Sequence, residues 1–245
     1  MNEKYFEQLQ TEITIRNLLP STGKPYHYYI KTFLLYFGKE ACEMEDIRKF
    51  LLFKKSKGMS AATLNLYNSA IRFFLRHVLH RQWDWELIPR MKVDRVLPNV
   101  LSQEEVQHLL DVTQNLKHKT MLATMCSSGL RVSEVCALHY HDISRSLIHI
   151  HVRHSKNRLD RYALLSERNL ELLTHYWREC GKPTEILFPS RYSGEYLTVG
   201  SIEQVVKKSA KKAGFKKSIS PHPCAIVSLV ICWKPVSKKL IFKSY

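Results

Sequence analysis

The sequence predicts a mainly α-helical chain with a small antiparallel β-sheet. Apolar residues recur every three or four positions along most of the chain, which is the period of an amphipathic helix. Residues 147–152 instead alternate between apolar and polar side chains, as a half-buried strand does. The chain has 245 residues, 44% of them hydrophobic, which is enough material for two compact units with separate cores. We therefore expect two domains.

Residues 1–82 are predicted to form a small helical bundle. Two stretches carry the helical period most clearly, and they contain Tyr29, Phe33, Leu34 and Phe37, and then Leu64, Tyr67, Ile71, Phe74 and Val78. Helix entry signals separate the helices. Ser21 and Thr22 precede one helix, residues 44–46 open the next, and Ser60 stands at the start of another.

Residues 83–99 lose the helical period and contain Pro89 and Pro98, which indicates a linker. The linker is basic, with Arg90, Lys92 and Arg95.

The second domain begins at residue 100. Ser102 followed by Glu105 is a capping box that starts a helix. A helical region over 120–138 leads to the strand at 147–152, a turn, and a second strand at 162–165. Helices over 167–177 and 202–213 follow, the last one ended by Gly214.

The charge balance favours a polyanionic partner. Lys and Arg number 38 against 22 Asp and Glu, a net charge of +16, and nucleic acid is the first candidate. The six cysteines form no C-x-x-C pair or metal-ligand spacing, so we expect reduced thiols and no metal ion. The start lacks the apolar core of a signal peptide, and no long apolar run occurs. We expect a soluble, cytoplasmic protein without membrane contact.

Three groups of cationic residues are candidates for phosphate contacts. Arg131 lies at a helix start with Glu134 one turn on, a spacing that lets the carboxylate brace the guanidinium; an ordinary surface pair is the alternative. The turn between the two strands and its flanks carry Arg153, Lys156, Arg158 and Arg161, where a solvated turn is the alternative. A Lys-rich helix carries Lys207, Lys208, Lys211 and Lys212, and His222 follows it.

A set of motifs in a fixed order resembles the tyrosine recombinase (phage integrase) family. The motifs are G-L-R-V-S-E at 129–134, a lysine in a β-turn at Lys156, D-R-Y-A-L-L-S at 160–166, L-F-P-S at 187–190, G-x-x-L-T at 194–198 and I-S-P-H at 219–222. The resemblance implies an amino-terminal helical core-binding domain over 1–82 that binds DNA, and a catalytic domain from residue 100.

The resemblance also implies an activity: site-specific DNA strand exchange through a phosphotyrosyl intermediate, with no cofactor. Arg131 then grips the scissile phosphate with Glu134 behind it, Lys156 protonates the leaving 5′ oxygen, and His222 assists proton transfer. Double-stranded DNA is the implied partner, encircled by the two domains, with other protomers in a synaptic complex.

The resemblance stops after His222. The family's H-x-x-R pattern calls for arginine where this chain has Ala225, and residues 223–245 contain no acidic side chain. Codons allowed from Pro223 onward, read one base out of register, can spell M-R-H-S-F-A-S-H-L-L-E-A-G, which resembles the family sequence. We interpret 100–222 as a truncated catalytic domain and 223–245 as an out-of-frame tail. Tyr245 is then not the nucleophile.

This interpretation predicts a protein that binds DNA without cutting it. Two alternatives stay open: an active strand-exchange enzyme, and a helical interaction protein whose basic faces serve solubility.

Overall fold

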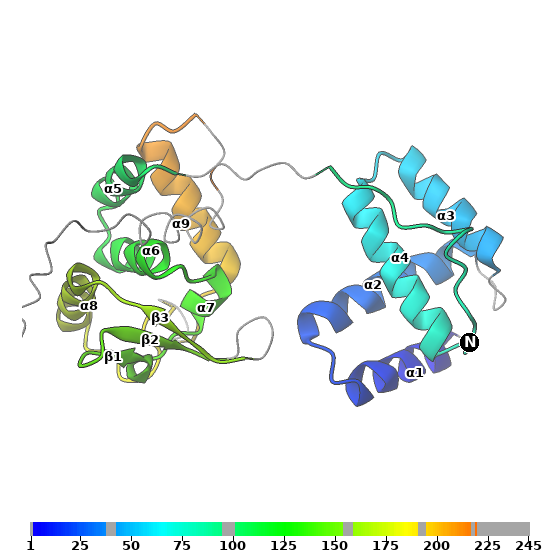
Figure 1. Cartoon of the computed structure of the whole chain (residues 1–245), viewed down its shortest axis with the longest axis horizontal. Helices are drawn as coiled ribbons and strands as arrows, with labels where there is room; N and C mark the ends of the chain where they lie inside the picture. Colours follow the sequence, from blue (N-terminus) through cyan, green and yellow to red (C-terminus); the bar gives the residue numbers. More distant parts are fainter. Residues whose placement is uncertain are drawn as a thin grey trace, which may run out of the picture. The chain divides into compact units, whose positions relative to one another are not determined.

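A computed structural model describes residues 2–37, 43–94, 101–153, 159–190, 195–216 and 219. The chain divides into two compact units, Met1–Val96 and Leu97–Tyr245, each with its own hydrophobic core. The described residues are mostly helical, with one three-stranded antiparallel sheet (Figure 1). The predicted fold class is therefore confirmed. None of the helices in these ranges is long and apolar enough to cross a membrane.

The first unit is a helical bundle. Its helices are α1 (Asn2–Ile15), α2 (Pro20–Phe37), α3 (Met44–Ser56) and α4 (Ala61–His77). Ser60 caps α4 as predicted, since its hydroxyl accepts a hydrogen bond from the Thr63 backbone nitrogen at 3.3 Å. The prediction that Ser21 and Thr22 precede α2 is wrong. The helix begins at Pro20, because proline suits the first helical position, where no N–H partner is needed.

Aromatic side chains fill the core of this bundle. The helical period turns Phe33, Phe50, Tyr67 and Phe74 inward, and all four are almost fully buried. The Phe50 ring touches two others edge-on, with centroid distances of 5.1 Å to Phe33 and 5.5 Å to Tyr67. Helices α2, α3 and α4 therefore share one packed interior.

The chain after α4 packs on the first unit over much of the segment that sequence assigns to a linker. Ile88 is 3% exposed and belongs to the first core. The Asn65 side-chain amide donates to the Met91 carbonyl oxygen at 2.9 Å, and its oxygen accepts from the Met91 nitrogen at 3.0 Å. Arg90 and Lys92 remain exposed, whereas Arg95 lies outside the described residues.

The second unit contains the sheet. Its elements are α5 (Gln103–Asp111), α6 (Leu116–Ser128), α7 (Val132–Cys136), the 3₁₀ turn η1 (Tyr140–Asp142), β1 (Ile143–Ser144), β2 (His149–Val152), β3 (Arg161–Leu164), α8 (Glu167–Glu179) and α9 (Val199–Lys212). The strands run in the order β1-β2-β3, with Ile150 opposite both Ile143 and Ala163. Strand β2 begins later than predicted because Ile148 has a left-handed backbone, φ 48°.

Helix α6 runs through the centre of this core, with residues 120–126 buried all round. Ser102 caps α5 with Glu105 as its capping-box partner, as predicted. The region predicted to be helical over 120–138 contains two helices, and the second begins after Arg131, as predicted. Gly129 takes a left-handed conformation, φ 62°, which ends α6 and lets the separate short helix α7 begin at Val132.

Candidate phosphate-binding site of the second unit

The turn between α6 and α7 presents Arg131 at the start of a helix. Arg131 is the residue before the first turn of α7, and its backbone nitrogen donates to Glu134 Oε2 at 2.8 Å. The Arg131 side chain reaches the same carboxylate, with a terminal guanidinium nitrogen 2.7 Å from Oε1. The predicted contact between Arg131 and Glu134 is thus present, and it closes a capping box.

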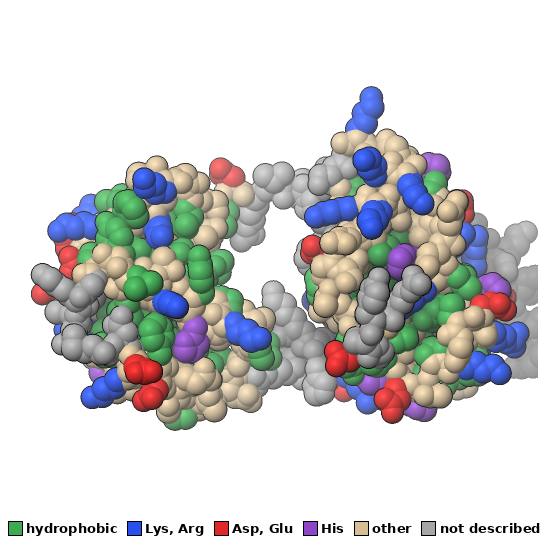
Figure 2. Space-filling model, turned by 180° about the vertical axis from the view of Figure 1, so that it is seen from behind, with side chains coloured by type: hydrophobic (Ala, Val, Ile, Leu, Met, Phe, Trp, Pro, Cys, Tyr) green, Lys and Arg blue, Asp and Glu red, His purple; other side chains and the backbone are tan. Residues whose placement is uncertain are grey.

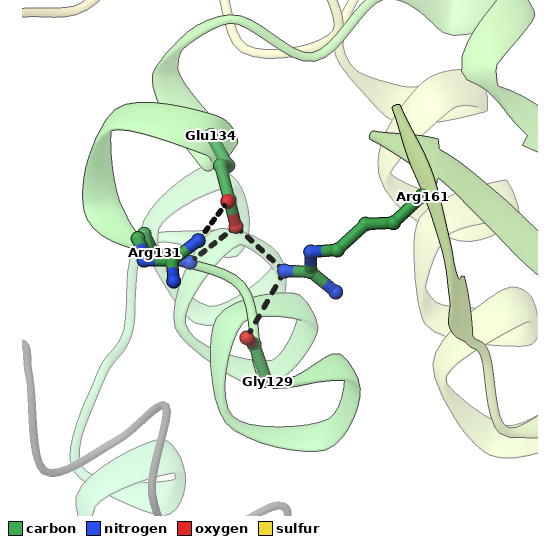
Figure 3. A network of polar contacts seen from close by, with 4 residues as sticks. All are labelled: Gly129, Arg131, Glu134 and Arg161. Carbon is green, nitrogen blue, oxygen red and sulfur yellow. Dashed lines mark hydrogen bonds and ion pairs between the residues drawn. The ribbon is translucent and has the colours of Figure 1, made fainter. Parts of the chain in front are cut away.

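Glu134 also holds a second arginine. From strand β3, Arg161 donates through one terminal nitrogen to Glu134 Oε2 at 2.7 Å, and the same nitrogen lies 3.5 Å from the Gly129 carbonyl oxygen (Figure 3). The Glu134 side chain is 4% exposed. A buried carboxylate is costly unless cations and hydrogen bonds compensate it, and here two guanidinium groups and a backbone N–H do so.

The pair of arginines retains capacity for a further anion. Arg131 is 47% exposed and Arg161 is 35% exposed, so solvent reaches both side chains. A guanidinium has five N–H donors, and Glu134 engages one nitrogen of each group. Two positive charges face one negative charge, which leaves an excess positive charge beside the turn. Phosphate oxygens match this donor geometry.

The other hairpin cation that the structure describes is also paired. Arg153 Nε lies 2.7 Å from Asp142 Oδ1, and Asp142 is 3% exposed while Arg153 is half exposed. The Asp142 Oδ2 atom accepts from the His139 backbone nitrogen at 2.8 Å. The remaining predicted residues of the site, Lys156, Arg158 and His222, lie outside the described residues.

The predicted Lys-rich helix is α9, and its lysines face solvent. Ile202, Val206 and Ala210 bury one side of the helix in the second core. Figure 2 shows Lys and Arg side chains gathered on the part of this unit where Figure 1 places α9. The exposed set is Lys207, Lys208, Lys211 and Lys212.

Two partly buried residues at the start of α6, Lys117 and His118, were not selected from the sequence. Lys117 contacts the Pro189 carbonyl oxygen, and burial lowers the pKa of its ammonium group. Burial also lowers the pKa of His118, and the charges of Lys117 and Lys208 lower it further. No local sequence pattern marks either residue. The effect of Lys208 on the pKa of His118 depends on a contact between α6 and α9, which are far apart in the sequence.

The cysteines that the structure describes differ in burial. Within the described ranges, Cys126 and Cys136 are buried, Cys180 is exposed, and none of the three forms a disulfide. Burial raises the pKa of the Cys136 thiol to about 11, which keeps it protonated near neutral pH. Among the same residues, no group of three His, Cys, Asp or Glu side chains is arranged to hold a metal ion.

Comparisons with known proteins cover both units. Residues 5–85 match the family model "Phage integrase, N-terminal SAM-like domain", and residues 99–224 match "Phage integrase family". A putative integrase/recombinase of Sinorhizobium fredii is 32% identical over 220 residues, which is 88% of this chain and 71% of that protein. A tyrosine recombinase of Pseudothermotoga lettingae is 28% identical over 221 residues, covering 85% of this chain and 76% of that protein.

Two solved structures share the fold. A lambda integrase dimer bound to a COC′ core site has a TM-score of 0.75 at 18% identity, covering 96% of this chain and 90% of that one. A lambda integrase tetramer bound to a Holliday junction has a TM-score of 0.74 at 18% identity, covering 97% of this chain and 74% of that one.

Proposed function

The chain belongs to the phage integrase family of tyrosine recombinases, and from that premise we propose that it binds double-stranded DNA by holding a backbone phosphate at Arg131 and Arg161. The family predicted from the ordered motifs is confirmed by the match over residues 99–224 and by the Sinorhizobium relative. The phosphate contact is the proposal.

One observation carries it: the buried carboxylate of Glu134 holds two guanidinium groups at once. Arginines fixed in this way lose little further side-chain freedom when a phosphate arrives, so more of the contact energy remains as affinity. Because Glu134 neutralises only one of the two charges, the site attracts an anion.

Other cations supply the rest of the DNA surface in this proposal. They are Arg90, Lys92 and Arg95 in the basic segment, Arg153, Lys156 and Arg158 on the hairpin, and Lys207, Lys208, Lys211 and Lys212 on α9. By their match to the family motifs, Lys156 takes the position of the proton donor to the 5′ oxygen, and His222 takes that of the assisting histidine.

The DNA-bound form is proposed to include more than one protomer. The lambda integrase structures that share this fold are a dimer on a core site and a tetramer on a Holliday junction. A synaptic assembly of this chain on DNA is the corresponding expectation.

We further propose that the chain as written does not cleave DNA. Ala225 stands where the family's second phosphate-binding arginine is expected, and the family match ends at residue 224. Loss of one preorganised donor to a transition state commonly costs about 2.7–4 kcal/mol, a slowing of about 100- to 1,000-fold. An active strand-exchange enzyme is the competing function, and the family positions at Arg131, Lys156 and His222 favour it.

A covalent-capture assay separates these two functions. The chain is incubated with a nicked suicide substrate, and binding and covalent adduct are measured on the same samples. We expect a bound complex without an adduct, whereas a gene with one base reinserted at codon 223 should yield an adduct. A tyrosine-linked adduct from the unrepaired chain would exclude the non-cleaving function, and absence of any DNA complex would exclude both.

A further inference from the structure

The first unit contains a cationic pocket of about 700 Å³ beside the carboxyl half of α4. Its walls combine two kinds of side chain, cationic and aromatic. The cationic ones include Arg72, Arg76 and Arg81, and the aromatic ones include Tyr26, Trp83 and Trp85. This volume is within the range of about 300–1,000 Å³ that small-ligand pockets occupy.

A left-handed turn at the end of α4 builds the pocket. His80 has φ 51°, and the turn is closed by hydrogen bonds from Leu79 N to Phe74 O at 3.1 Å and from Arg81 N to Leu75 O at 2.9 Å. The chain then runs back beside α4 (Figure 1). A left-handed non-glycine residue is strained, and such strain is common at functional sites.

The returning segment brings aromatic rings against the arginines of α4. The Arg72 guanidinium carbon lies 4.7 Å from the centroid of the Trp85 ring, and the Trp83 and Trp85 rings meet edge-on at 6.4 Å. The buried indole nitrogen of Trp83 finds no acceptor among the described residues. A buried donor without an acceptor is destabilising, and an acceptor on a bound ligand removes this cost.

The electrostatics of the pocket favour an anion. None of the described residues that line it is acidic. His77, another lining residue, is held mainly neutral at pH 7, because burial and then the charges of Arg16 and Arg76 lower the pKa of its imidazole. The positive charge is therefore carried by guanidinium groups, which bind phosphate bidentately.

We infer that this pocket binds one unpaired nucleotide of a DNA substrate, with the base against the aromatic rings and its phosphate on Arg76 and its neighbours. The inference rests on the proposed DNA binding and adds a separate site in the first unit. A paired base shows only its edge in the grooves, whereas an unpaired base exposes a face that can stack on tryptophan. A concave pocket admits such a base, while the convex backbone of an intact duplex meets only the rim.

The test compares gapped with fully paired DNA of the same sequence. The variant is Arg76→Gln, since Arg76 is exposed and lies outside the core, and the control is Lys49→Gln, an exposed residue of α3 that does not line the pocket. Both changes remove one positive charge, so they lower general electrostatic attraction alike. Affinity is measured by fluorescence anisotropy on the full chain.

Arg76→Gln is expected to weaken binding of the gapped DNA by about tenfold, and to weaken binding of the paired DNA no more than Lys49→Gln does. A second variant, Trp85→Leu, should show the same selectivity, whereas Trp85→Phe should keep most of the gapped-DNA affinity because it keeps a ring. Equal losses on gapped and paired DNA, or no loss on either, would overturn the inference.

A titration with thymidine monophosphate tests the pocket separately from DNA binding. Stacking of the base on Trp83 or Trp85 should quench tryptophan fluorescence. Arg76→Gln should raise the nucleotide concentration needed for half-maximal quenching by about tenfold. If the chain binds no DNA but shows this quenching, the proposed function fails and the pocket stands. If neither free nucleotide nor gapped DNA distinguishes Arg76→Gln from Lys49→Gln, the pocket fails.

Discussion

The cations of the second unit are held in two different ways. Arg131 and Arg161 share one buried carboxylate, whereas no ion pair joins the α9 lysines to an acid in the part of the chain that the structure describes. We call a cation braced when a carboxylate holds it in place, as Glu134 holds these arginines. A braced cation can position a phosphate, whereas an unbraced lysine attracts the DNA backbone without fixing it. The same formal charge should therefore produce different responses to mutation, salt and pH.

The largest expected effect is a loss of stability when Glu134, which braces both arginines, is removed. Glu134→Ala leaves two guanidinium groups facing each other and removes the acceptor for the Arg131 backbone nitrogen. Hydrogen bonds to charged groups contribute about 1.5–3 kcal/mol, so the free energy of unfolding should fall by about 3 kcal/mol. Urea denaturation measures this change. A loss below about 0.5 kcal/mol would show that Glu134 does not support the arginines.

Removing one braced arginine should affect binding more than folding. In Arg131→Ala, Glu134 keeps Arg161 as its partner, so the free energy of unfolding should change by less than about 1 kcal/mol. DNA affinity should fall by about 10- to 150-fold, the equivalent of about 1.5–3 kcal/mol for a charge-assisted contact. The matched control is Lys211→Ala on α9. Equal affinity losses in the two variants would remove the distinction between braced and unbraced cations.

The sequence predicted the Arg131–Glu134 half of this arrangement but not the whole of it. Glu134 lies three residues from Arg131, so helix geometry alone brings them together. Arg161 is 27 residues away from Glu134 and was assigned to the hairpin surface, because turns favour exposed cations. Its contact with Glu134 depends on how β3 packs beside α6 and α7, which no local pattern encodes.

The same division between local and distant contacts runs through the fold. The Ser60 and Ser102 caps and the helical periods were predictable because each depends on neighbours in sequence. The two hydrogen bonds between the Asn65 side chain and the Met91 backbone join residues 26 positions apart, and nothing in the proline-containing segment predicts them.

Salt provides a smaller and more uniform test of the α9 lysines. Each of Lys207→Gln, Lys208→Gln, Lys211→Gln and Lys212→Gln should reduce the slope of log affinity against log salt by up to about 0.9, the value for one neutralised phosphate. Stability at neutral pH should be unchanged, because these side chains are exposed. Binding isotherms at several salt concentrations measure the slope. A slope that stays constant in all four variants would mean that α9 does not face DNA.

The smallest expected effect is a change in the pKa of His118 on α6, caused by a lysine of α9. Burial, then Lys117 and Lys208, lower the pKa of His118 from 6.5. The folded state therefore binds fewer protons than the unfolded state as pH falls from about 7 through the usual histidine range. Stability contributed by neutral His118 is present above pH 6.5 and is lost as pH falls toward the lowered folded pKa.

Lys208→Ala should raise the pKa of His118 toward 6.5, because one of the two nearby cations is removed while burial and Lys117 remain. Lys211→Ala is the control, since Lys211 is not among the groups that shift His118. An NMR titration of the His118 imidazole measures the pKa, and the acid-side loss of stability should become shallower in Lys208→Ala. Lys208 then acts on its partly buried neighbour His118 through charge. A pKa that moves equally in both variants, or in neither, would place Lys208 too far from α6 for this coupling.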